Sequence, residues 1–525
     1  MPGESQQHAA ALFSVYDRTG VVELAKDFAS AGVAIYATSG TRAHLRGAGI
    51  DARDVDELTG FPALFEGRVK TLHPKIFGGI LGDFGSAAHR EEAQRYGFGP
   101  IAAVVVNLYP FEQTVARGAT LEEAIEQIDI GGVALIRAAA KNFENVTVLV
   151  DPQQYPAVRA ALPGGVDESA RRKLATRAFE RTAEYDAAIA RYLEAGLLPS
   201  ELPGSLALTL PLAEKLRYGE NPQSRAAFYL SSTDALPEQL WGKALSYNNM
   251  LDLDATLRLL VRAPSPERGE SEHAQSPAPV RAAVVKHTVP CGVAERRETA
   301  SALREALESD PISAFGGIVA VDGHLDAASA EILSAYFLEI VAAPHFSDDA
   351  LERLRRKRNL RIIRYEASLP GRLARELRVR SALGGVLAED DDPGSPPERW
   401  RIVSQRAPSP SEWADLRFAW DVVRHVKSNG VVVVKDGATR GICAGQTNRV
   451  SAVRIATKRA GQWSRGAACA SDGFFPFSDG LEAAAAAGCS AVIAPEGSIR
   501  DAEVIASADA QAISLVFSTY RYFLH

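Results

Sequence analysis

The sequence of 525 residues is about three and a half times as long as a typical domain of roughly 150 residues, so at least two domains are expected. Its 58 Lys and Arg against 65 Asp and Glu give a net charge of −7, which excludes an overall basic field that would drive non-specific nucleic-acid binding. Hydrophobic residues make up 46% and charged residues 23%, so the composition predicts a chain that builds cores and excludes disorder over most of its length.

The four cysteines lie far apart in the sequence without a CxxC pair, and no secretory apolar segment follows Met1. This usage is typical of the reducing cytoplasm and predicts no disulfides. The longest apolar stretches, such as 101–106 and 480–494, are too short or too rich in Gly and Ala to cross a bilayer, which takes about 20 residues. A membrane protein is therefore excluded.

The first part of the chain alternates short apolar strands with amphipathic helices. Strands are predicted at 11–15, 33–36, 103–106 and 146–150, and helices at 21–31, 121–128 and 133–141. Continuous apolar strands separated by helices indicate a parallel sheet covered on both faces, and thus an α/β domain. A long helical pattern at 168–195 leads into a Leu-, Pro- and Ser-rich stretch, so we predict a domain boundary near residue 200, with 1–8 as a loose tail.

A second series of buried strands is predicted at 281–285, 317–321, 431–435, 491–494 and 513–517. The segments 284–292 (VVKHTVPCG) and 424–434 (RHVKSNGVVVV) are faintly alike, which is too little to establish an internal duplication. Pro-, Ser- and acid-rich stretches at 263–279 and 389–398 predict solvated loops.

Two turns rich in hydroxyl side chains and glycine follow the first two predicted strands. The turn at 14–20 reads SVYDRTG and the turn at 37–41 reads ATSGT, and each leads into a predicted helix. Such turns expose backbone N–H groups to a phosphate, and at one edge of a parallel sheet they converge on one crevice. The spacing fits neither a Walker loop nor GxGxxG, so we predict a phosphorylated small molecule. An ordinary capping turn, with Asp17 or Thr19 as N-cap, is the alternative for the first.

Three further segments add polar groups to the first domain. Residues 67–75 (GRVKTLHPK) place four basic side chains around a proline that prevents a continuous helix, which predicts either an anion site or a solvated loop. Tyr109 follows a buried strand, where it faces the ligand crevice or fills the core. In 126–142, Asp129 precedes a double glycine and a helix that carries Arg137 and Lys141 four residues apart, a like-charge pair that favours an anionic ligand.

In the second domain, His287 is the best candidate for catalysis among ten histidines. It follows Lys286 at the end of a buried strand, where a cation beside a group that titrates near neutrality suits proton transfer, although a lone histidine is more often structural. The following PCGVA lacks the second cysteine of a zinc deaminase, so no zinc is expected.

Four other motifs of the second domain combine aromatic, amide and charged groups. LRYGENPQ at 216–223 and KALSYNN at 243–249 fit ligand contacts or plain turns. DGFFPFSD at 472–479 offers aromatic walls and a carboxylate to a pterin, or else forms a hydrophobic staple. RYFLH at 521–525 predicts a terminal segment bound into the protein.

These motifs carry a family resemblance. SVYDRTG, TSGT, GRVKTLHP, VVNLYPF and IDIGGVALIRAAAKN resemble the inosine monophosphate (IMP) cyclohydrolase half of the bifunctional purine biosynthesis proteins. RYGENPQ, KALSYNN, VVKHTVPCG, DPISAFGG, VKSN, GICAGQTNRV and SDGFFPFSD resemble the other half, the aminoimidazole carboxamide ribotide (AICAR) formyltransferase. The resemblance implies a methylglyoxal-synthase-like domain at 9–200 and, at 201–525, two related subdomains similar to cytidine deaminase without its zinc.

The resemblance implies formyl transfer from 10-formyltetrahydrofolate to AICAR, followed by closure of formyl-AICAR to IMP. It also implies a cytoplasmic homodimer without a catalytic metal, and it leaves room for a structural potassium ion. The implied catalytic residues are Lys286 and His287 for transfer, and Lys70, Tyr109, Asp129 and Lys141 for ring closure. The implied substrate contacts are Ser14, Arg18, Ser39, Gly40, Thr41 and Arg68 in the first half, and Arg217, Tyr218, Asn249, Asn429, Arg449, Phe475, Asp479 and Arg521 in the second.

Several residues depart from the family's pattern. Tyr16 stands in place of a small hydroxyl residue, Arg18 of lysine, Ser39 of glycine and Phe77 of histidine, while Leu524 replaces a basic residue. A transformylase with a disabled cyclohydrolase half therefore stays open as an alternative. A non-catalytic purine-ribotide sensor is the other alternative, and the intact proton-transfer groups argue against it.

Overall fold

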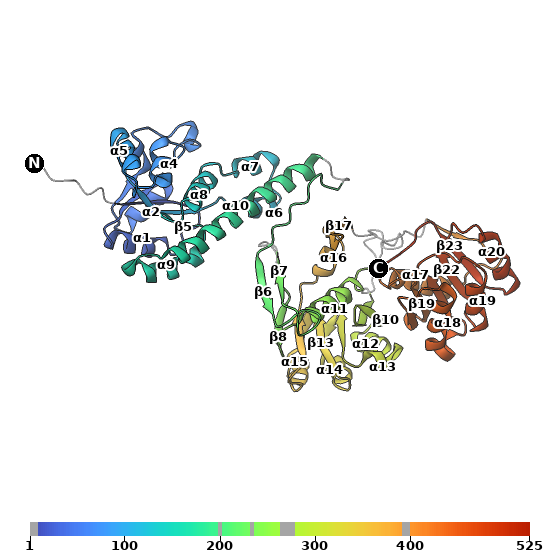
Figure 1. The fold of residues 1–525 in the computed structure, drawn as a ribbon. Coiled ribbons are helices and arrows are strands. Elements are labelled where there is room, and N and C mark those ends of the chain that lie inside the picture. Colours follow the sequence, from blue (N-terminus) through green and yellow to red (C-terminus); the bar gives the residue numbers. More distant parts are fainter. Residues whose placement is uncertain (1–8, 198–201, 231–235, 263–278, 391–398) are drawn as a thin grey trace, which may run out of the picture. The chain divides into compact units, whose positions relative to one another are not determined.

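The computed structural model describes residues 9–197, 202–230, 236–262, 279–390 and 399–525. The chain forms two compact units, with the main break between Pro211 and Leu212, about ten residues beyond the predicted boundary. The predicted tail at 1–8 and nearly all of the loops predicted at 263–279 and 389–398 lie outside the described residues. Figure 1 shows the ribbon of both units.

The first unit is built on a five-stranded sheet in the order β3-β2-β1-β4-β5. Every neighbouring pair is parallel, as the sequence predicts. Alternate residues of β1 enter opposite cores, with Ala11 and Phe13 on one face and Leu12 on the other, so both faces are covered. The strands are β1 (Ala10–Val15), β2 (Ala34–Ala37), β3 (Ala52–Asp54), β4 (Ile101–Asn107) and β5 (Thr147–Leu149).

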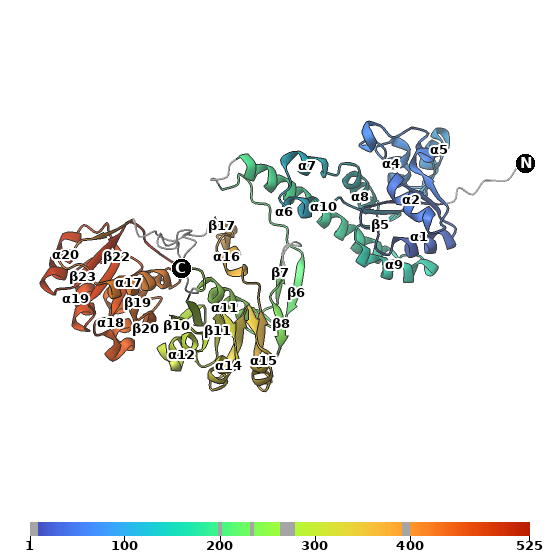
Figure 2. The ribbon, with the colours of Figure 1, turned by 180° about the vertical axis from the view of Figure 1, so that it is seen from behind.

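Among the described residues of this unit, ten α-helices accompany the sheet (Figures 1 and 2). Helix α4 begins at Pro74, where the missing N–H of proline costs nothing, and His73 caps it by accepting from the Lys75 N–H. The helices are α1 (Val21–Ser30), α2 (Ser39–Gly47), α3 (Val55–Thr59), α4 (Pro74–Leu81), α5 (Ala87–Tyr96), α6 (Phe111–Ala116), α7 (Leu121–Glu126), α8 (Gly131–Lys141), α9 (Tyr155–Ala161) and α10 (Glu168–Leu197).

The second unit contains a mixed twelve-stranded sheet made of two halves with the same topology. The order in one half is β10-β9-β11-β13-β15-β8, and in the other β20-β19-β21-β22-β23-β18. In each half, an outer strand and a capped helix precede an antiparallel hairpin, which is followed by alternating helices and parallel strands. Strands β10 and β20 join the halves.

The first repeat comprises β8 (Glu238–Trp241), α11 (Tyr247–Arg258), β9 (Val280–Lys286), β10 (Val289–Arg296), α12 (Thr299–Ser309), β11 (Gly317–Val321), α14 (Ala327–Ser334), β13 (Leu338–Ala343), α15 (Asp348–Arg355) and β15 (Arg361–Arg364). The second comprises β18 (Trp400–Ile402), α17 (Pro410–Val423), β19 (Val431–Lys435), β20 (Ala438–Cys443), α18 (Arg449–Ala460), β21 (Ala468–Ser471), α19 (Asp479–Ala486), β22 (Ala491–Pro495), α20 (Asp501–Ala510) and β23 (Ser514–Ser518).

The repeat corrects the sequence comparison, because the counterpart of 284–292 is 433–441 (VVKDGATRG) and not 424–434. Both segments run through a strand, a two-residue turn and the start of a second strand. A Cβ at Gly292 would lie 1.9 Å from the Ala306 carbonyl oxygen, and one at Gly441 would lie 2.0 Å from that of Ala456. The same glycine therefore permits the same close approach of strand and helix in each repeat.

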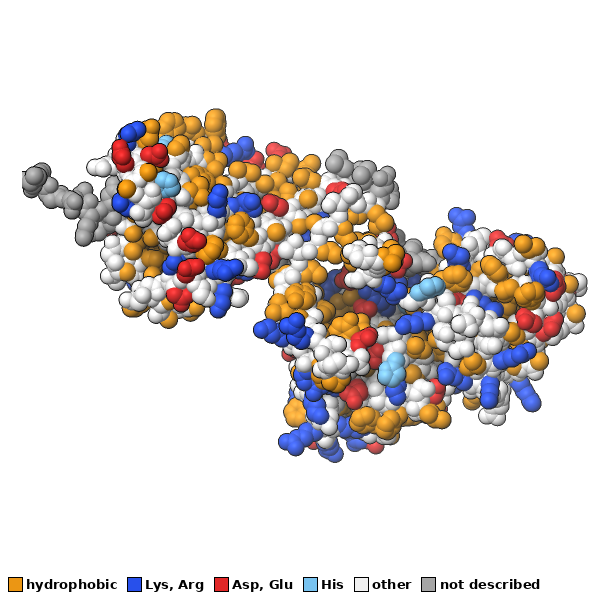
Figure 3. Space-filling view, viewed as in Figure 1, with side chains coloured by type: hydrophobic (Ala, Val, Ile, Leu, Met, Phe, Trp, Pro, Cys, Tyr) orange, Lys and Arg blue, Asp and Glu red, His pale blue; other side chains and the backbone are white. Residues whose placement is uncertain are grey.

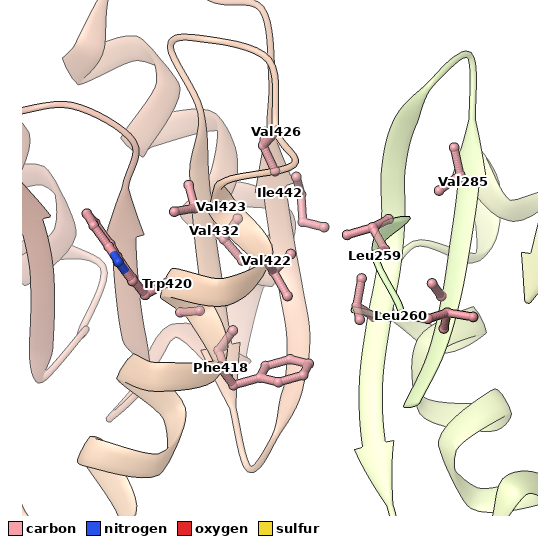
Figure 4. Close-up of a cluster of buried hydrophobic side chains, with 14 of the residues drawn as sticks. Leu259, Leu260, Val285, Phe418, Trp420, Val422, Val423, Val426, Val432 and Ile442 are labelled. Atoms are coloured by element: carbon pink, nitrogen blue, oxygen red, sulfur yellow. The ribbon is translucent and has the colours of Figure 1, made fainter. Parts of the chain in front are cut away.

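One apolar core is shared by the two repeats (Figure 4). Phe418 and Trp420 of α17 belong to the same buried cluster as Leu259, Leu260 and Val285 of the first repeat. Burial of this shared cluster makes the two repeats one unit.

Candidate functional site

A cavity of about 800 Å³ in the first unit gathers most of the predicted cyclohydrolase residues. Residues from both strand-end turns line it, so the prediction that the turns converge on one crevice is confirmed. Ser39, the exposed first residue of α2, lies beside Gly40. The predicted residues that line the cavity are Ser14, Arg18, Gly40, Thr41, Arg68, Lys70, Tyr109 and Asp129.

Side-chain hydrogen bonds fix the first turn. Asn107 Oδ1 accepts from the backbone N–H groups of Tyr16 and Asp17 at 2.6 and 2.8 Å, and its Nδ2 donates to the Asp17 carbonyl oxygen. Thr41 Oγ1 accepts from the Val15 N–H at 3.0 Å. The N-cap of α1 is Gly20 rather than Asp17 or Thr19, so the capping alternative is wrong.

Arg18 replaces the family's lysine and lies over the glycine of the second turn. A Cβ at Gly40 would stand 3.3 Å from Arg18 Nη2, so glycine leaves space for the guanidinium. Thr38 Oγ1 donates to Ser14 Oγ at 3.2 Å and links the two turns. The mouth of the cavity thus presents a cation, hydroxyl groups and the start of α2, the groups that bind a phosphate.

The carboxylate of Asp129 is bonded to the first turn of α8. Its Oδ1 accepts from the Gly132 N–H at 2.6 Å, and a Cβ at Gly132 would lie 2.5 Å from Oδ2, so glycine lets the carboxylate approach. Burial raises the pKa of Asp129, while the Gly132 hydrogen bond and the charge of Lys70 lower it less. The pKa of this carboxyl is thereby shifted towards neutral pH, where general acid–base catalysis is most efficient.

Tyr109 lines the cavity with 39% of its side-chain surface exposed, so it is not a core residue. Its ring packs edge-on against Tyr16, with 5.9 Å between ring centroids. Burial and then the charge of Asp129 raise the pKa of Tyr109, which keeps the phenol protonated. Arg68 pairs with Glu126 at 2.5 Å on the wall of the same cavity, and both side chains are more than half exposed, so an anion site and a solvated loop both stay predictions for 67–75.

The structure separates Lys141 from this cavity. Asp129 lies at the start of α8 and Lys141 is its last residue, so about 15 Å of helix separates them at 1.5 Å per residue. Lys141 lines a second pocket with Phe77 and Arg137, and the Arg137 guanidinium lies 5.5 Å from the Phe179 ring centroid. This cation–π contact gives Arg137 a partner without an anion. A catalytic role for Lys141 stays a prediction.

In the second unit, Lys286 and His287 lie at the turn between β9 and β10. Lys286 Nζ donates to the Phe315 carbonyl oxygen at 2.8 Å, and the side chain of His287 is exposed. His287 and Thr288 have φ angles of 56° and 59°, in the left-handed region. Asp252 of α11 accepts from both of their backbone N–H groups.

Four motifs of the second repeat meet at the buried side chain of Asp472. Its carboxylate accepts from Ser428 and pairs with Arg449, and its carbonyl oxygen accepts from the Tyr522 N–H. Asn429 donates from Nδ2 to the Gln446 carbonyl oxygen at 2.7 Å beside this cluster. The prediction that 521–525 is bound into the protein is therefore confirmed.

The other predicted contacts of the second unit fall at separate places. Asn249 lies in the first turn of helix α11 and completes its capping box, where its Oδ1 accepts from the Ser246 N–H, so it is not part of a plain turn. Arg217 lies 5.1 Å from the Tyr218 ring centroid, and Arg521 lies 4.7 Å from that of Phe523. Phe475 is buried at 2% exposure, while Asp479 begins α19. Their ligand contacts stay predictions.

The described residues contain no group of three or more His, Cys, Asp or Glu side chains placed to hold a metal ion. All four cysteines are buried and unpaired, and burial raises the pKa of Cys291 to about 12. Among the helices of the described ranges, none is long and apolar enough to cross a membrane. Acidic and basic side chains are interspersed over the face drawn in Figure 3.

The first unit has a parallel sheet and a cavity lined by groups that bind phosphate, and the second has a duplicated mixed sheet. Together they define a two-domain enzyme that acts on phosphorylated small molecules. A family model described as "MGS-like domain" matches residues 20–134, and one described as "AICARFT/IMPCHase bienzyme" matches residues 139–459. A solved structure titled "Crystal structure of ForH" is 35% identical over 36% of this chain and 99% of its own, with a TM-score of 0.32.

Three curated relatives align with nearly the whole chain, and each is named "Bifunctional purine biosynthesis protein PurH". The Myxococcus xanthus protein is 47% identical over 98% of this chain and 100% of its own. The Desulfitobacterium hafniense protein (strain DSM 10664 / DCB-2) is 45% identical over 98% and 99%, and the Chloroflexus aurantiacus protein is 47% identical over 98% of both. The chain belongs to this family, the bifunctional AICAR formyltransferases and IMP cyclohydrolases, and it catalyses the last two steps of IMP synthesis.

Sequence reasoning missed two residues that organise these sites. Asn107 fixes the first turn, and its only sequence signal is its place at the end of a buried strand, where a polar side chain can bind a neighbouring turn. Asp252 gave no signal in isolation. Its role becomes visible when α11 is aligned with α17, where Asp415 takes the same place.

Proposed function

We propose that ring closure takes place in the cavity of the first unit, with Lys70, Tyr109 and Asp129 around the reacting atoms. The phosphate of formyl-AICAR binds Ser14, Arg18, Ser39, Gly40 and Thr41, and Arg68 lies nearby. The observation that carries this proposal is the convergence of both strand-end turns and Asp129 on one cavity.

In the proposed reaction, the carboxamide nitrogen bonds to the formyl carbon, whose oxygen becomes a hydroxyl group. The C–O bond then breaks, and the oxygen leaves as water with one proton from the carboxamide nitrogen and one from the formamide nitrogen. Asp129 is suited to accept the nitrogen proton, because burial raises its pKa. Lys70 stabilises the negative charge that develops on the formyl oxygen. Orientation of two groups on one ring supplies much of the acceleration, so no catalytic metal is needed.

We propose that formyl transfer takes place at the β9–β10 turn of the second unit. His287 accepts a proton from the AICAR amine as its nitrogen attacks the formyl carbon of 10-formyltetrahydrofolate, and Lys286 stabilises the oxyanion of the tetrahedral intermediate. The intermediate collapses by breaking the bond between the formyl carbon and N10, and His287 returns its proton to N10 so that tetrahydrofolate leaves. The ribotide contacts are Arg217, Tyr218, Asn249, Arg449 and Arg521, and the formyl and pterin contacts are Asn429, Phe475 and Asp479.

Lys286 and His287 lie at the β9–β10 turn, whereas Asn429 and Arg449 lie at or beside Asp472, so we propose that a homodimer completes each transfer site. The repeat topology and the absence of a second cysteine after Pro290 support two cytidine-deaminase-like subdomains without zinc. We also propose that a structural potassium ion can bind this unit, as the family resemblance allows. A cytoplasmic location fits the four unpaired cysteines.

The two activities can be separated in one protein. We expect His287→Ala to abolish formyl transfer while ring closure of supplied formyl-AICAR continues, and Asp129→Asn to do the reverse. Lys141→Ala, which changes the second pocket of the first unit, tests whether that residue acts in ring closure. Normal transfer by His287→Ala together with normal closure by Asp129→Asn would refute the assignment. Formyl-AICAR that accumulates in the unaltered protein would instead indicate a disabled cyclohydrolase half.

A further inference from the structure

The turn that carries His287 has a backbone that its residues do not favour. A two-residue hairpin with both φ angles positive is the type I′ turn, which prefers Asn-Gly or Asp-Gly. His287 and Thr288 occupy it with φ angles of 56° and 59°. A β-branched residue such as threonine rarely adopts this region, so the turn needs an external constraint.

Asp252 of α11 provides that constraint. Its Oδ2 accepts from the His287 N–H at 3.2 Å, and its Oδ1 accepts from the Thr288 N–H at 2.6 Å. Both carboxylate oxygens are therefore used by the two residues of the turn, and the carboxylate touches the backbone of the candidate proton acceptor.

The second repeat contains the same arrangement of an aspartate and a left-handed turn, but the turn has no histidine. Asp415 of α17 accepts from Asp436 and Gly437 N–H at 3.0 and 2.7 Å, and those residues have φ angles of 54° and 64°. Lys435 Nζ donates to the Gly466 carbonyl oxygen at 2.5 Å, as Lys286 does to Phe315.

The two repeats therefore share the lysine, the carboxylate and the turn geometry, and they differ at the turn residues. The second repeat has Asp-Gly, which suits the turn, whereas the first has His-Thr, which does not. A residue choice that opposes the turn is expected where the side chain has a functional role.

We propose that Asp252 is a positioning residue for formyl transfer, which holds the His287 imidazole in place by fixing the left-handed turn through its two amide hydrogen bonds. The inference rests on the proposed role of His287. Asp415 performs the same backbone task in the second repeat without serving catalysis, so it is a matched internal control.

The test compares Asp252→Asn with Asp415→Asn in the full-length chain. An asparagine keeps the size but offers one acceptor oxygen to two N–H donors, so the turn loses its constraint. We expect Asp252→Asn to lower the kcat of formyl transfer about tenfold or more, with the KM for AICAR within about threefold. Ring closure of supplied formyl-AICAR is expected to be unchanged. Asp415→Asn is expected to lower the thermal midpoint and leave kcat within about twofold.

A second substitution distinguishes positioning from a general loss of stability. Thr288→Gly in the Asp252→Asn background gives the turn the glycine found at Gly437, so kcat is expected to recover to within about threefold of the unaltered protein. Asp252→Ser, which also offers one acceptor, replaces Asp252→Asn if that variant does not fold.

The inference is overturned if Asp252→Asn keeps kcat within about twofold, if Asp415→Asn lowers kcat equally, or if Thr288→Gly restores nothing. His287→Ala separates this failure from that of the proposed function. An active His287→Ala variant refutes the assignment of His287 itself. An inactive His287→Ala variant beside a fully active Asp252→Asn variant refutes only the role of Asp252.

Discussion

Gly132→Ala is a precise test of the cyclohydrolase site, because it moves a carboxylate without changing any charged group. The added Cβ would lie 2.5 Å from Asp129 Oδ2, about 1 Å closer than ordinary van der Waals contact allows. The clash is with the end of a side chain, so the fold can survive by displacing the carboxylate from the Gly132 N–H.

A displacement of about 1 Å at a reacting group can lower a rate about a hundredfold, which corresponds to about 2.7 kcal/mol of transition-state stabilisation. The lost hydrogen bond costs about 2 kcal/mol of stability, while alanine in place of glycine within a helix returns about 1 kcal/mol. We therefore expect a large fall in the rate of ring closure and a small fall in the thermal midpoint.

The assay follows IMP formation from supplied formyl-AICAR, with formyl transfer by the same preparation as an internal control. Gly47→Ala is the matched variant, since no atom lies within 4 Å of a Cβ at that helical glycine, and both activities should be unchanged. Ring closure by Gly132→Ala within about threefold of the unaltered rate would show that the position of Asp129 does not limit the reaction.

Three further predictions concern other parts of the chain. Tyr16→Ser is expected to slow ring closure about two- to tenfold, because it removes the ring that packs edge-on against Tyr109. Tyr16→Phe keeps that ring and should keep the rate. Equal rates of ring closure in the two variants would contradict the prediction. Burial raises the pKa of Glu295, but the charges of Arg281 and Arg262 outweigh burial, so the pKa is lower than that of an ordinary Glu. The carboxylate therefore stabilises the fold above the ordinary Glu pKa, and this stabilisation is lost as the pH falls through the folded-state pKa. Glu295→Gln should therefore lower the free energy of unfolding at pH 7 by about 3 kcal/mol, which a lower thermal midpoint would report. The difference in midpoint between the variant and the unaltered protein should shrink towards pH 3. A difference that stays constant with pH would refute the prediction. The four buried cysteines should resist iodoacetamide at pH 8 until the protein unfolds, and rapid labelling of the folded protein would contradict their burial.

Four of the five strands in the first unit could be predicted because they are short apolar runs followed by turns, whereas the edge strand β3 is the polar three-residue segment ARD, which carries no such pattern. Strands β10 and β20 were not predicted, since VPCGVAER and ATRGIC contain glycine and charged residues that hide an apolar pattern. Their glycines serve helix contact, which depends on tertiary structure. The family resemblance implies the duplication, but comparison of the two segments could not establish it, because the repeats share chiefly positions that the backbone requires, such as the lysine before the turn and the glycine after it.

The residues of the candidate site could be predicted where the strand order alone brings them together. Ser14, Gly40 and Thr41 line one cavity, as the sequence predicts, because parallel strands end at one edge of a sheet. Lys141 was grouped with Asp129 by motif alone, although the rise of a helix already separates its two ends. The capping role of Asn249 and the burial of Phe475 depend on neighbours distant in the sequence or on packing, which no local pattern reveals.

The shared core and the buried ion pair between Arg281 and Asp421 have a consequence for unfolding of the second unit. Neither repeat can lose its structure without exposing apolar side chains and an unpaired charge of the other. The two repeats should therefore unfold in a single cooperative transition, although each has the topology of a separate domain. The cooperativity couples the stability of the β9–β10 turn to substitutions far away in the second repeat.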